Sequence, residues 1–192
     1  MTNLAIFVSG SGTNCENIIR YFTQEQPRRD VRIALVLSNK SDAYALVRAQ
    51  NLNVPTVVME KRQFHDGESV LKVMKEYEID FIVLAGFLLM IPDFLLRAYP
   101  RRIVNIHPSL LPKYGGKGMW GHHVHEAVYE AKEKESGITI HWVSEVCDGG
   151  EIIAQFKTPL SPEDTPDDIA DKVHVLEMKN FPKVIEEVIQ TL

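Results

Sequence analysis

Short apolar, β-branched runs alternate with amphipathic stretches along most of the chain, and this alternation constrains the fold more than any other feature. The runs predict strands over Leu4–Ser9, Val31–Leu37, Thr56–Glu60, Phe81–Ala85 and Ile103–Ile106. The stretches between them predict helices near Asn14–Phe22, Asp42–Asn51, Gly67–Tyr77 and Pro92–Tyr99, with Pro92 as the first helical residue. Such an alternation is typical of an α/β fold, in which a doubly wound, mostly parallel sheet carries helices on both faces.

The pattern changes after residue 113. The segment KYGGKGMWG (113–121) contains four glycines and predicts a loop. A helix is expected over about His122–Lys134, followed by strands over Gly137–Ser144 and Glu151–Leu160 that pair as an antiparallel hairpin. Thr165 is expected to cap a last helix, which Pro182 should interrupt near its middle. No linker or repeat is evident, so we expect a single domain over residues 1–192.

Composition limits the class of partner. The 192 residues are 45% hydrophobic and carry a formal net charge of -5, which argues against a nucleic-acid-binding surface. No apolar run approaches the length of a membrane span, and no signal-peptide pattern is evident. The two cysteines, Cys15 and Cys147, lack metal-ligand spacing and are expected to be reduced thiols in a cytoplasm.

Three of the predicted strands end in unusual polar or glycine-rich segments: SGSGTN (9–14), AGFLLM (85–90) and NIHPS (105–109). In open α/β sheets, ligands bind beyond the carboxyl ends of the strands, so these ends predict a site. Asn105 and His107 are two residues apart and therefore point to the same side of an extended segment, which Pro108 helps to maintain. Asp148 in CDGG could lie beside His107, orient its ring and favour its protonated form. The alternative interpretation is a strand that runs into a turn, with Asp148 as an Asp-Gly turn former.

The segment SGSGTN follows the first predicted strand and opens a helix. Backbone N–H groups at a helix N-terminus favour an anion, so Gly12, Thr13 and Asn14 are candidates to hold a phosphate. A dinucleotide site is less well supported, because Cys15 stands where the third glycine of that motif belongs. A plain glycine-rich strand–helix turn remains the alternative, and Cys15 is expected to be a small buried apolar residue. The run HHVHE (122–126) lacks acidic or cysteine partners at ligand spacing, so no metal is expected there.

Taken together, SGSGTN, VLAGF, NIHPSLLPKY, the G-x-T-x-H stretch at 137–141 and D-G-G at 148–150 resemble the folate-dependent phosphoribosylglycinamide formyltransferases, also called glycinamide ribonucleotide transformylases. The resemblance runs in order along essentially the whole chain and implies a formyltransferase-type Rossmann-like topology. It implies transfer of the formyl group of 10-formyltetrahydrofolate to the amine of 5′-phosphoribosylglycinamide in de novo purine (IMP) biosynthesis. The implied products are the N-formyl compound and tetrahydrofolate. The implied partners are these small molecules, with no metal, no nucleic acid and no membrane, in a monomer or homodimer. A cis Leu111–Pro112 bond is also implied.

The resemblance also implies roles for individual residues. Asn105 and His107 would stabilise an oxyanion, and Asp148 would assist proton handling. The implied substrate phosphate site consists of Gly12, Thr13 and Asn14. The other implied substrate-binding residues are Gly86, Pro108, His174 and Glu177. The implied folate-binding residues are Leu88, Leu89, Met90, Ile91, Asn105, Ser144, Glu145, Val146, Cys147 and Asp148. Leu89 stands where the family usually carries a basic residue.

Two other classes of function are compatible with the sequence. Within the same superfamily, a 10-formyltetrahydrofolate hydrolase would be expected to carry a regulatory domain before the first strand. A formyltransferase for initiator methionyl-tRNA would be expected to carry a basic C-terminal domain. A non-catalytic phosphosugar-binding module would not need the Asn-x-His and Asp residues to act together. In such a module the side chains of Asn105, His107 and Asp148 could lie far apart.

Overall fold

A computed structural model describes all 192 residues, which divide into two compact units, Met1–Val104 and Asn105–Leu192. The expectation of a single domain over residues 1–192 stays a prediction. In neither unit is any helix both long enough and apolar enough to cross a membrane.

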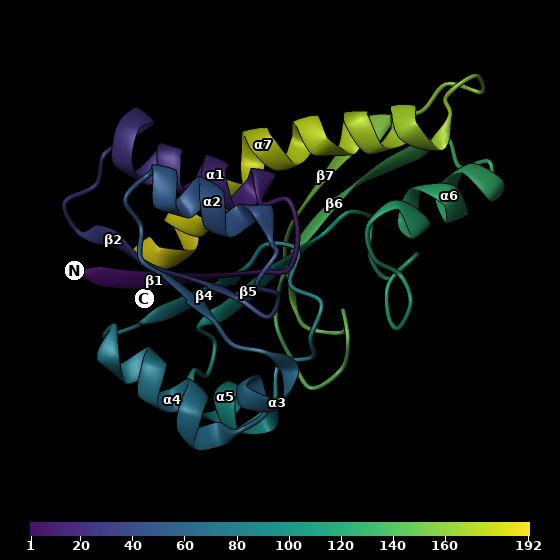
Figure 1. The fold of residues 1–192 in the computed structure, drawn as a ribbon. Coiled ribbons are helices and arrows are strands. Elements are labelled where there is room, and N and C mark those ends of the chain that lie inside the picture. Colours follow the sequence, from purple (N-terminus) through teal and green to yellow (C-terminus); the bar gives the residue numbers. More distant parts are fainter. The chain divides into compact units, whose positions relative to one another are not determined.

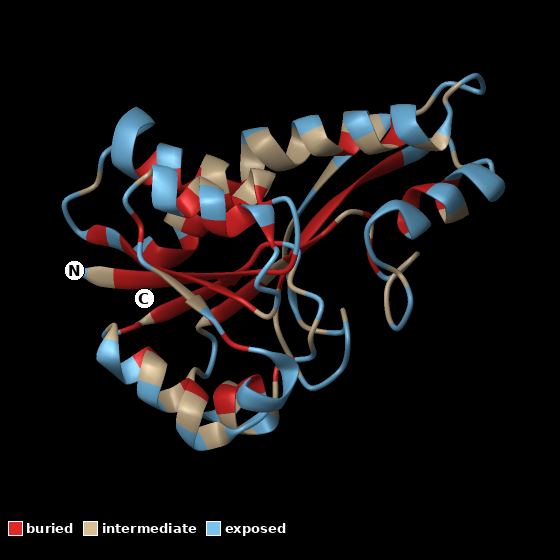
Figure 2. Ribbon diagram, viewed as in Figure 1, coloured by how far each residue is buried: buried red, intermediate tan, exposed pale blue.

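The first unit contains a parallel sheet with the strand order β3-β2-β1-β4. The strands are β1 (Thr2–Val8), β2 (Val31–Ser38), β3 (Thr56–Val58) and β4 (Phe81–Leu84). Residues Leu4–Val8 of β1 are fully buried, as the red strands of Figure 2 show. A continuous apolar run is what a parallel strand covered on both faces requires. Beyond β4, the Ile82 N–H donates to the Arg102 carbonyl (2.8 Å), just before β5 (Ile103–His107) begins.

Helices cover both faces of this sheet, as a doubly wound fold requires (Figure 1). One face carries α1 (Thr13–Arg20) and α2 (Tyr44–Asn51), and a π-helical turn, η1 (Tyr21–Glu25), continues α1. The other face carries α3 (Lys61–Phe64), α4 (Gly67–Glu76) and α5 (Asp93–Ala98). Pro92 was expected as the first helical residue, but it lies just before α5 with an extended backbone (ψ 151°). The four-residue α3 was not predicted, because it is too short to show a helical period.

The second unit is built on an antiparallel hairpin. The strand order is β5-β6-β7, where β6 is Glu135–Trp142 and β7 is Ile152–Pro159, and β6 and β7 pair antiparallel. The predicted hairpin is therefore confirmed. The remaining helices are α6 (His122–Glu130), which ends four residues before its predicted end, and α7 (Pro166–Gln190). Helix α7 packs against α6 and against both strands of the hairpin (Figure 1).

The long helix α7 begins as predicted but does not break as predicted. The Thr165 hydroxyl oxygen accepts from the Asp168 N–H (3.2 Å), and Pro166 occupies the first turn. The prediction that Pro182 interrupts the helix is wrong, because α7 continues through it. Phe181, Val184 and Ile185 are all buried. Burial of these apolar side chains offsets the single backbone hydrogen bond that the proline removes.

The two cysteines are free thiols. Cys15 is fully buried in α1, which confirms the expected small apolar role, and burial raises the pKa of its thiol to about 12. Cys147 is exposed.

Candidate active site

The predicted catalytic residues all lie in the second unit, where β5 delivers Asn105 and His107. His107 is 4% exposed, and Asn105 is partly buried. The strand runs into a turn in which the Leu111–Pro112 bond is cis, as expected. Thr139 on β6 stabilises this turn with two hydrogen bonds. Its hydroxyl donates to the Ser109 carbonyl (2.7 Å) and accepts from the Leu111 N–H (3.0 Å). The end of β5 is therefore held against β6 by buried hydrogen bonds.

The turn after β5 determines which nitrogen of His107 carries a proton. His107 Nε2 lies 2.7 Å from the Tyr114 carbonyl oxygen. Because a carbonyl oxygen only accepts, Nε2 must carry a hydrogen and donate. Tyr114 adopts a left-handed backbone (φ 56°), which turns its carbonyl toward the ring. The other nitrogen, Nδ1, is left to face Asp148.

Asp148 approaches His107 from the β6–β7 connection. Its Oδ2 lies 3.5 Å from His107 Nδ1 and accepts from the Gly116 N–H at 2.9 Å. The carboxylate is largely buried, with 11% of the side chain exposed. Asp148 therefore faces the edge of the ring that the Tyr114 carbonyl does not hold. The structure thus places Asp148 beside His107, where the sequence argument expected it.

A further histidine, His141, joins this cluster and was missed as a site residue. His141 Nδ1 donates to the Trp142 carbonyl (2.9 Å), so its Nε2 can accept from the Asn105 side-chain nitrogen at 3.1 Å. Burial lowers the pKa of His141, outweighing the opposite effects of the Trp142 carbonyl and Asp148. The ring is therefore neutral near pH 7 and orients the Asn105 amide. The available signal was the polar residue that ends the G-x-T-x-H stretch at 137–141, in an otherwise buried strand.

The glycines after Asp148 are required by packing. A Cβ on Gly150 would lie 1.7 Å from the Trp142 carbonyl oxygen, and one on Gly149 would lie 2.6 Å from a Val146 methyl carbon. Asp148 itself has a positive φ of 53°, a conformation that Asp and Asn tolerate better than most residues. Glycine at 149 and 150 therefore lets the loop pack closely against Val146 and Trp142. This close packing holds the Asp148 carboxylate beside the histidines.

The candidate phosphate loop lies in the first unit. Gly12 precedes α1 with φ 77°, and a Cβ there would lie 2.3 Å from the Ala45 Cβ. Thr13 and Asn14 lie in the first turn of α1 and are partly exposed. Only glycine therefore fits at position 12, because of its positive φ and its close contact with α2. Thr13 and Asn14 follow it at the N-terminus of α1, where backbone N–H groups can bind an anion.

The predicted folate segment of the first unit follows β4. Gly86 has φ 74°, and the Leu88 N–H donates to the Ser9 hydroxyl (2.9 Å) at the end of β1. Leu88 and Met90 are exposed by 45% and 47%, Leu89 is partly exposed, and Ile91 is buried. Exposed apolar side chains beside a glycine turn are a surface on which a flat aromatic ligand can lie.

The predicted folate segment of the second unit is the loop that carries Asp148. The Ser144 hydroxyl donates to the Val146 carbonyl (3.1 Å) and so shapes the start of this loop. Val146 is 66% exposed, and Glu145 is also exposed. Partial burial, followed by the Asp148 carboxylate 3.8 Å away, raises the pKa of the Cys147 thiol.

Two further predicted residues lie one turn apart on α7. His174 Nδ1 is 3.3 Å from Glu177 Oε2, and this hydrogen bond raises the pKa of His174. Pro108 follows His107 at the end of β5 and is partly buried. No group of three or more His, Cys, Asp or Glu side chains is placed to hold a metal ion, the His122–Glu126 segment included.

Comparisons with known proteins place this geometry in a family. The formyl transferase family profile matches residues 2–185, so the chain belongs to the formyl transferase family. The chain is 35% identical over 191 residues to the phosphoribosylglycinamide formyltransferase of Haemophilus influenzae, covering 97% of this chain and 86% of the relative. Within the family it belongs with the phosphoribosylglycinamide formyltransferases.

Two further similarities support this placement. The chloroplastic phosphoribosylglycinamide formyltransferase of Arabidopsis thaliana is 40% identical over 95% of this chain, but the chain spans only 63% of that relative's length. The crystal structure of the enzyme from Anaplasma phagocytophilum superposes with a TM-score of 0.88 at 32% identity, covering 99% of this chain and 88% of that one. The α/β fold with a mostly parallel sheet and C-terminal antiparallel strands is thereby confirmed.

Proposed function

We propose that this protein transfers the formyl group of 10-formyltetrahydrofolate to the amine of 5′-phosphoribosylglycinamide. The observation that carries this proposal is the cluster of Asn105, His107 and Asp148, which β5 and the β6–β7 loop bring together around His141. Relatives named as phosphoribosylglycinamide formyltransferases support the choice of substrates. The product of the proposed reaction serves de novo purine biosynthesis.

The cluster suits the charges that the reaction develops. Attack by the amine builds negative charge on the formyl oxygen and positive charge on the incoming nitrogen. His141 takes one N–H of the Asn105 amide, and the second N–H can donate to the oxyanion. His107, when protonated, would add positive charge beside the same site.

Proton handling falls to Asp148. Its Oδ2 accepts from the Gly116 N–H at 2.9 Å. A carboxylate held in this way can accept the proton that the amine sheds, through a water molecule. Because the protein must hold two substrates together, a large part of the rate acceleration should come from positioning.

Binding roles follow the placement of the remaining residues. We assign the substrate phosphate to Gly12, Thr13 and Asn14, because these residues form a helix N-terminus. The remaining substrate contacts are assigned to Gly86, Pro108, His174 and Glu177. Folate is assigned to Leu88–Ile91, to Asn105 and to Ser144–Asp148. The exposed apolar side chains of Leu88, Met90 and Val146 suit a flat ring system.

Two alternatives differ in what they predict. A non-catalytic phosphosugar-binding module does not require the hydrogen-bonded cluster around His141, so the geometry favours an enzyme. A 10-formyltetrahydrofolate hydrolase could use the same cluster with water in place of the amine.

The cytoplasmic location and the monomer or homodimer state stay predictions, and some relatives are named as chloroplastic.

The experiment that separates these functions follows folate deformylation with and without the amine substrate. Purified protein is mixed with 10-formyltetrahydrofolate, and tetrahydrofolate formation is monitored by absorbance. A transferase requires phosphoribosylglycinamide and forms one N-formyl product per folate consumed. A rate that does not depend on the amine would identify a hydrolase, and no turnover in either mixture would contradict both enzymes.

The phosphate assignment needs a variant that leaves the packing intact. Gly12→Val is unsuitable, because its Cβ would collide with Ala45. Asn14→Asp instead adds a negative charge at the helix N-terminus, where it repels phosphate. Calorimetry should show weaker phosphoribosylglycinamide binding and unchanged folate binding. Asn17→Asp, one turn further along α1, is the matched control and should affect both ligands little. Equal losses for both ligands would contradict the assignment.

A further inference from the structure

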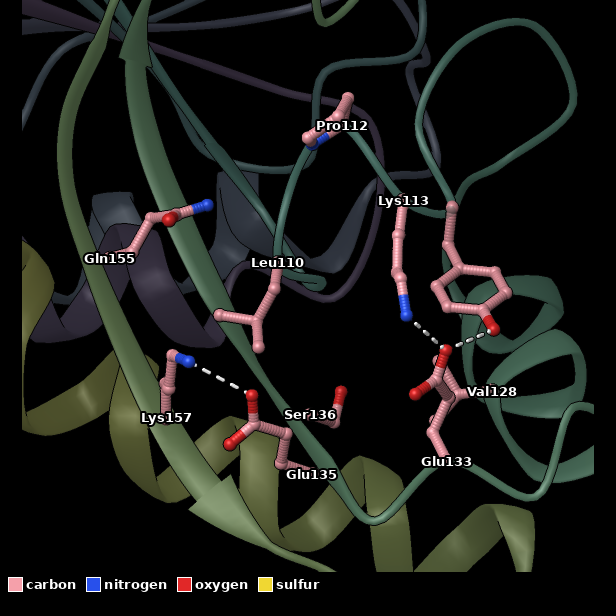
Figure 3. Close-up of a pocket in the computed structure, with 10 residues that line it drawn as sticks. Leu110, Pro112, Lys113, Val128, Glu133, Glu135, Ser136, Gln155 and Lys157 are labelled. Atoms are coloured by element: carbon pink, nitrogen blue, oxygen red, sulfur yellow. Dashed lines mark hydrogen bonds and ion pairs between the residues drawn. The ribbon is translucent and has the colours of Figure 1, made fainter.

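A cavity of about 250 Å³ lies in the second unit, apart from the catalytic cluster (Figure 3). None of Asn105, His107, Asp148 and His141 lines it. Its apolar wall consists of Leu110, Pro112 and Val128. The other lining residues are Lys113, Tyr114, Glu133, Glu135, Ser136, Gln155 and Lys157. Nothing in the proposed formyl transfer uses this cavity.

Ser136 marks the cavity as a polar site. The residue is 3% exposed, and its hydroxyl oxygen has no hydrogen-bond partner. Figure 3 shows this hydroxyl directed into the space between Leu110, Lys113 and Glu133. A buried hydroxyl without a partner is unfavourable, and a ligand atom that bonds to it would remove that cost.

The charged groups at the rim form two separate ion pairs. Lys113 Nζ lies 2.8 Å from Glu133 Oε1, and Lys157 Nζ lies 2.9 Å from Glu135 Oε1 (Figure 3). The cavity therefore presents two ammonium and two carboxylate groups with no net charge. A ligand with a single charge would face one repulsive group for each attractive one. A ligand with both charges can give a partner to both signs.

We propose that this cavity is a binding site for a small zwitterion of the α-amino-acid class. The carboxylate of the ligand would bind the Lys113 or Lys157 ammonium, and its ammonium would bind Glu133 or Glu135. Its side chain would contact Leu110 and Val128, and one of its polar atoms would pair with the Ser136 hydroxyl. The cavity is smaller than those that hold drug-sized ligands, which suits a compact metabolite.

Hydrogen bonds link this cavity to the active site. The Glu133 carboxylate accepts from the Tyr114 hydroxyl (2.9 Å), and the Tyr114 carbonyl accepts from His107 Nε2 (2.7 Å). A ligand ammonium that binds Glu133 competes with the Tyr114 hydroxyl and so perturbs the residue whose carbonyl holds His107. Occupancy should therefore be detectable at His107. Any effect of the bound ligand on the turnover rate rests on the proposed function, whereas ligand binding and the change at His107 do not.

Calorimetry on the full chain tests the ligand class without folate or ribonucleotide. The probes are glycine, L-alanine and L-valine, with acetate and methylammonium as singly charged controls. We expect saturable binding of at least one zwitterion, at least tenfold tighter than that of either control. No binding of any zwitterion, or equal binding of acetate or methylammonium, would overturn the proposal.

Variants then locate the bound probe. Ser136→Leu fills the cavity and should abolish binding, while Ser136→Ala removes only the hydroxyl and should weaken it several-fold. The Ala variant keeps the test valid if the Leu variant does not fold. Lys172→Gln breaks an ion pair with Asp164 at the start of α7 and is the matched control, which should leave binding unchanged. Binding that survives both Ser136 variants would place the ligand elsewhere and refute the site.

The link to His107 has its own readout. In a ¹⁵N–¹H spectrum, the His107 Nε2–H resonance should shift when the zwitterion binds to the native protein. The shift should be much smaller in Tyr114→Phe, which lacks the hydroxyl that Glu133 holds. Zwitterion binding with an unmoved His107 resonance would refute the link. Because neither experiment measures turnover, failure of the proposed formyl transfer would be seen separately.

Discussion

The two histidines of the candidate active site differ because they face different atoms. His107 donates through Nε2 to a carbonyl and presents Nδ1 to the Asp148 carboxylate. His141 donates through Nδ1 to a carbonyl, and its Nε2 accepts from Asn105. His107 thus faces a carboxylate, whereas burial lowers the pKa of His141, so the same residue type serves two roles.

The first prediction concerns Asp148 and His107 as a pair. Asp148→Asn should keep the fold, since Asn tolerates the positive φ at this position, but turnover should fall roughly 10²–10⁴-fold. Substrate affinities should change far less, because the lost interaction acts mainly in the transition state. Steady-state kinetics provides the measurement.

His107→Ala should show a deficit of similar size, and the double variant should lose much less than the product of the two effects. Losses that multiply fully would show that the two residues act independently and that Asp148 is only a turn residue.

The second prediction concerns the glycine behind Asp148. Gly150→Ala places a Cβ 1.7 Å from the Trp142 carbonyl oxygen, so the 145–150 loop must move. The melting temperature and the turnover should both fall. Gly67→Ala in helix α4 is the control, because its Cβ would make an ordinary 3.5 Å contact with the Phe94 ring. It should be neutral or stabilising by up to about 1 kcal/mol. If Gly150→Ala melts like the native protein, the steric argument fails.

At the scale of elements, the second unit depends on how α7 starts and how the hairpin is held. The capping box of Thr165 and Asp168 satisfies backbone donors at the start of a 25-residue helix. The helix then tolerates Pro182 because its buried face packs against the hairpin. The start of α7 thus rests on a local signal, and its continuity rests on packing.

The third prediction tests that cap. Thr165→Ala removes the hydroxyl that accepts from the Asp168 N–H and should destabilise the protein by about 1 kcal/mol. Thr165→Ser keeps an acceptor and should cost less. Chemical denaturation of the three proteins gives the free energies of unfolding. Equal losses for Ala and Ser would mean that the hydroxyl does not cap the helix.

At the scale of the whole molecule, buried histidines make stability depend on pH. Burial lowers the pKa of His125 and of His141, although nearby Glu177 and Asp148, respectively, oppose the shift. A histidine with a lowered folded-state pKa takes up its proton more readily when unfolded. Stability should therefore be full above the reference value of 6.5 and decrease as the pH falls below it.

The fourth prediction tests this dependence by thermal melting from pH 7.5 to 5.5. The native protein should lose melting temperature as the pH falls, and His125→Gln should flatten the curve. His174 acts in the opposite direction, because its hydrogen bond to Glu177 raises its pKa. The stability that His174 contributes is therefore lost as the pH rises through its raised pKa. His174 is partly exposed, so its effect should be the smaller one. A His125→Gln curve parallel to the native curve would contradict the assignment to His125.

The sequence by itself determined the features that depend on residues close together along the chain. Apolar runs such as LAIFV predicted the buried strands, and Thr165-Pro166 predicted the start of α7. The motifs NIHPSLLP and CDGG indicated Asn105, His107 and Asp148 as candidates, and the resemblance supplied their roles. These inferences succeed because periodicity, capping and turn conformation are local properties.

Only the tertiary structure decided the rest. His141 meets Asn105 across 36 residues of sequence, and this contact exists only because β5 and β6 lie side by side in the second unit. Pro182 remains within α7 because packing outweighs a local helix-breaking tendency. The cavity around Ser136 exists because the turn after β5 and the hairpin leave space over a small side chain. Each of these features depends on long-range packing, whose free energy no short stretch of sequence reveals.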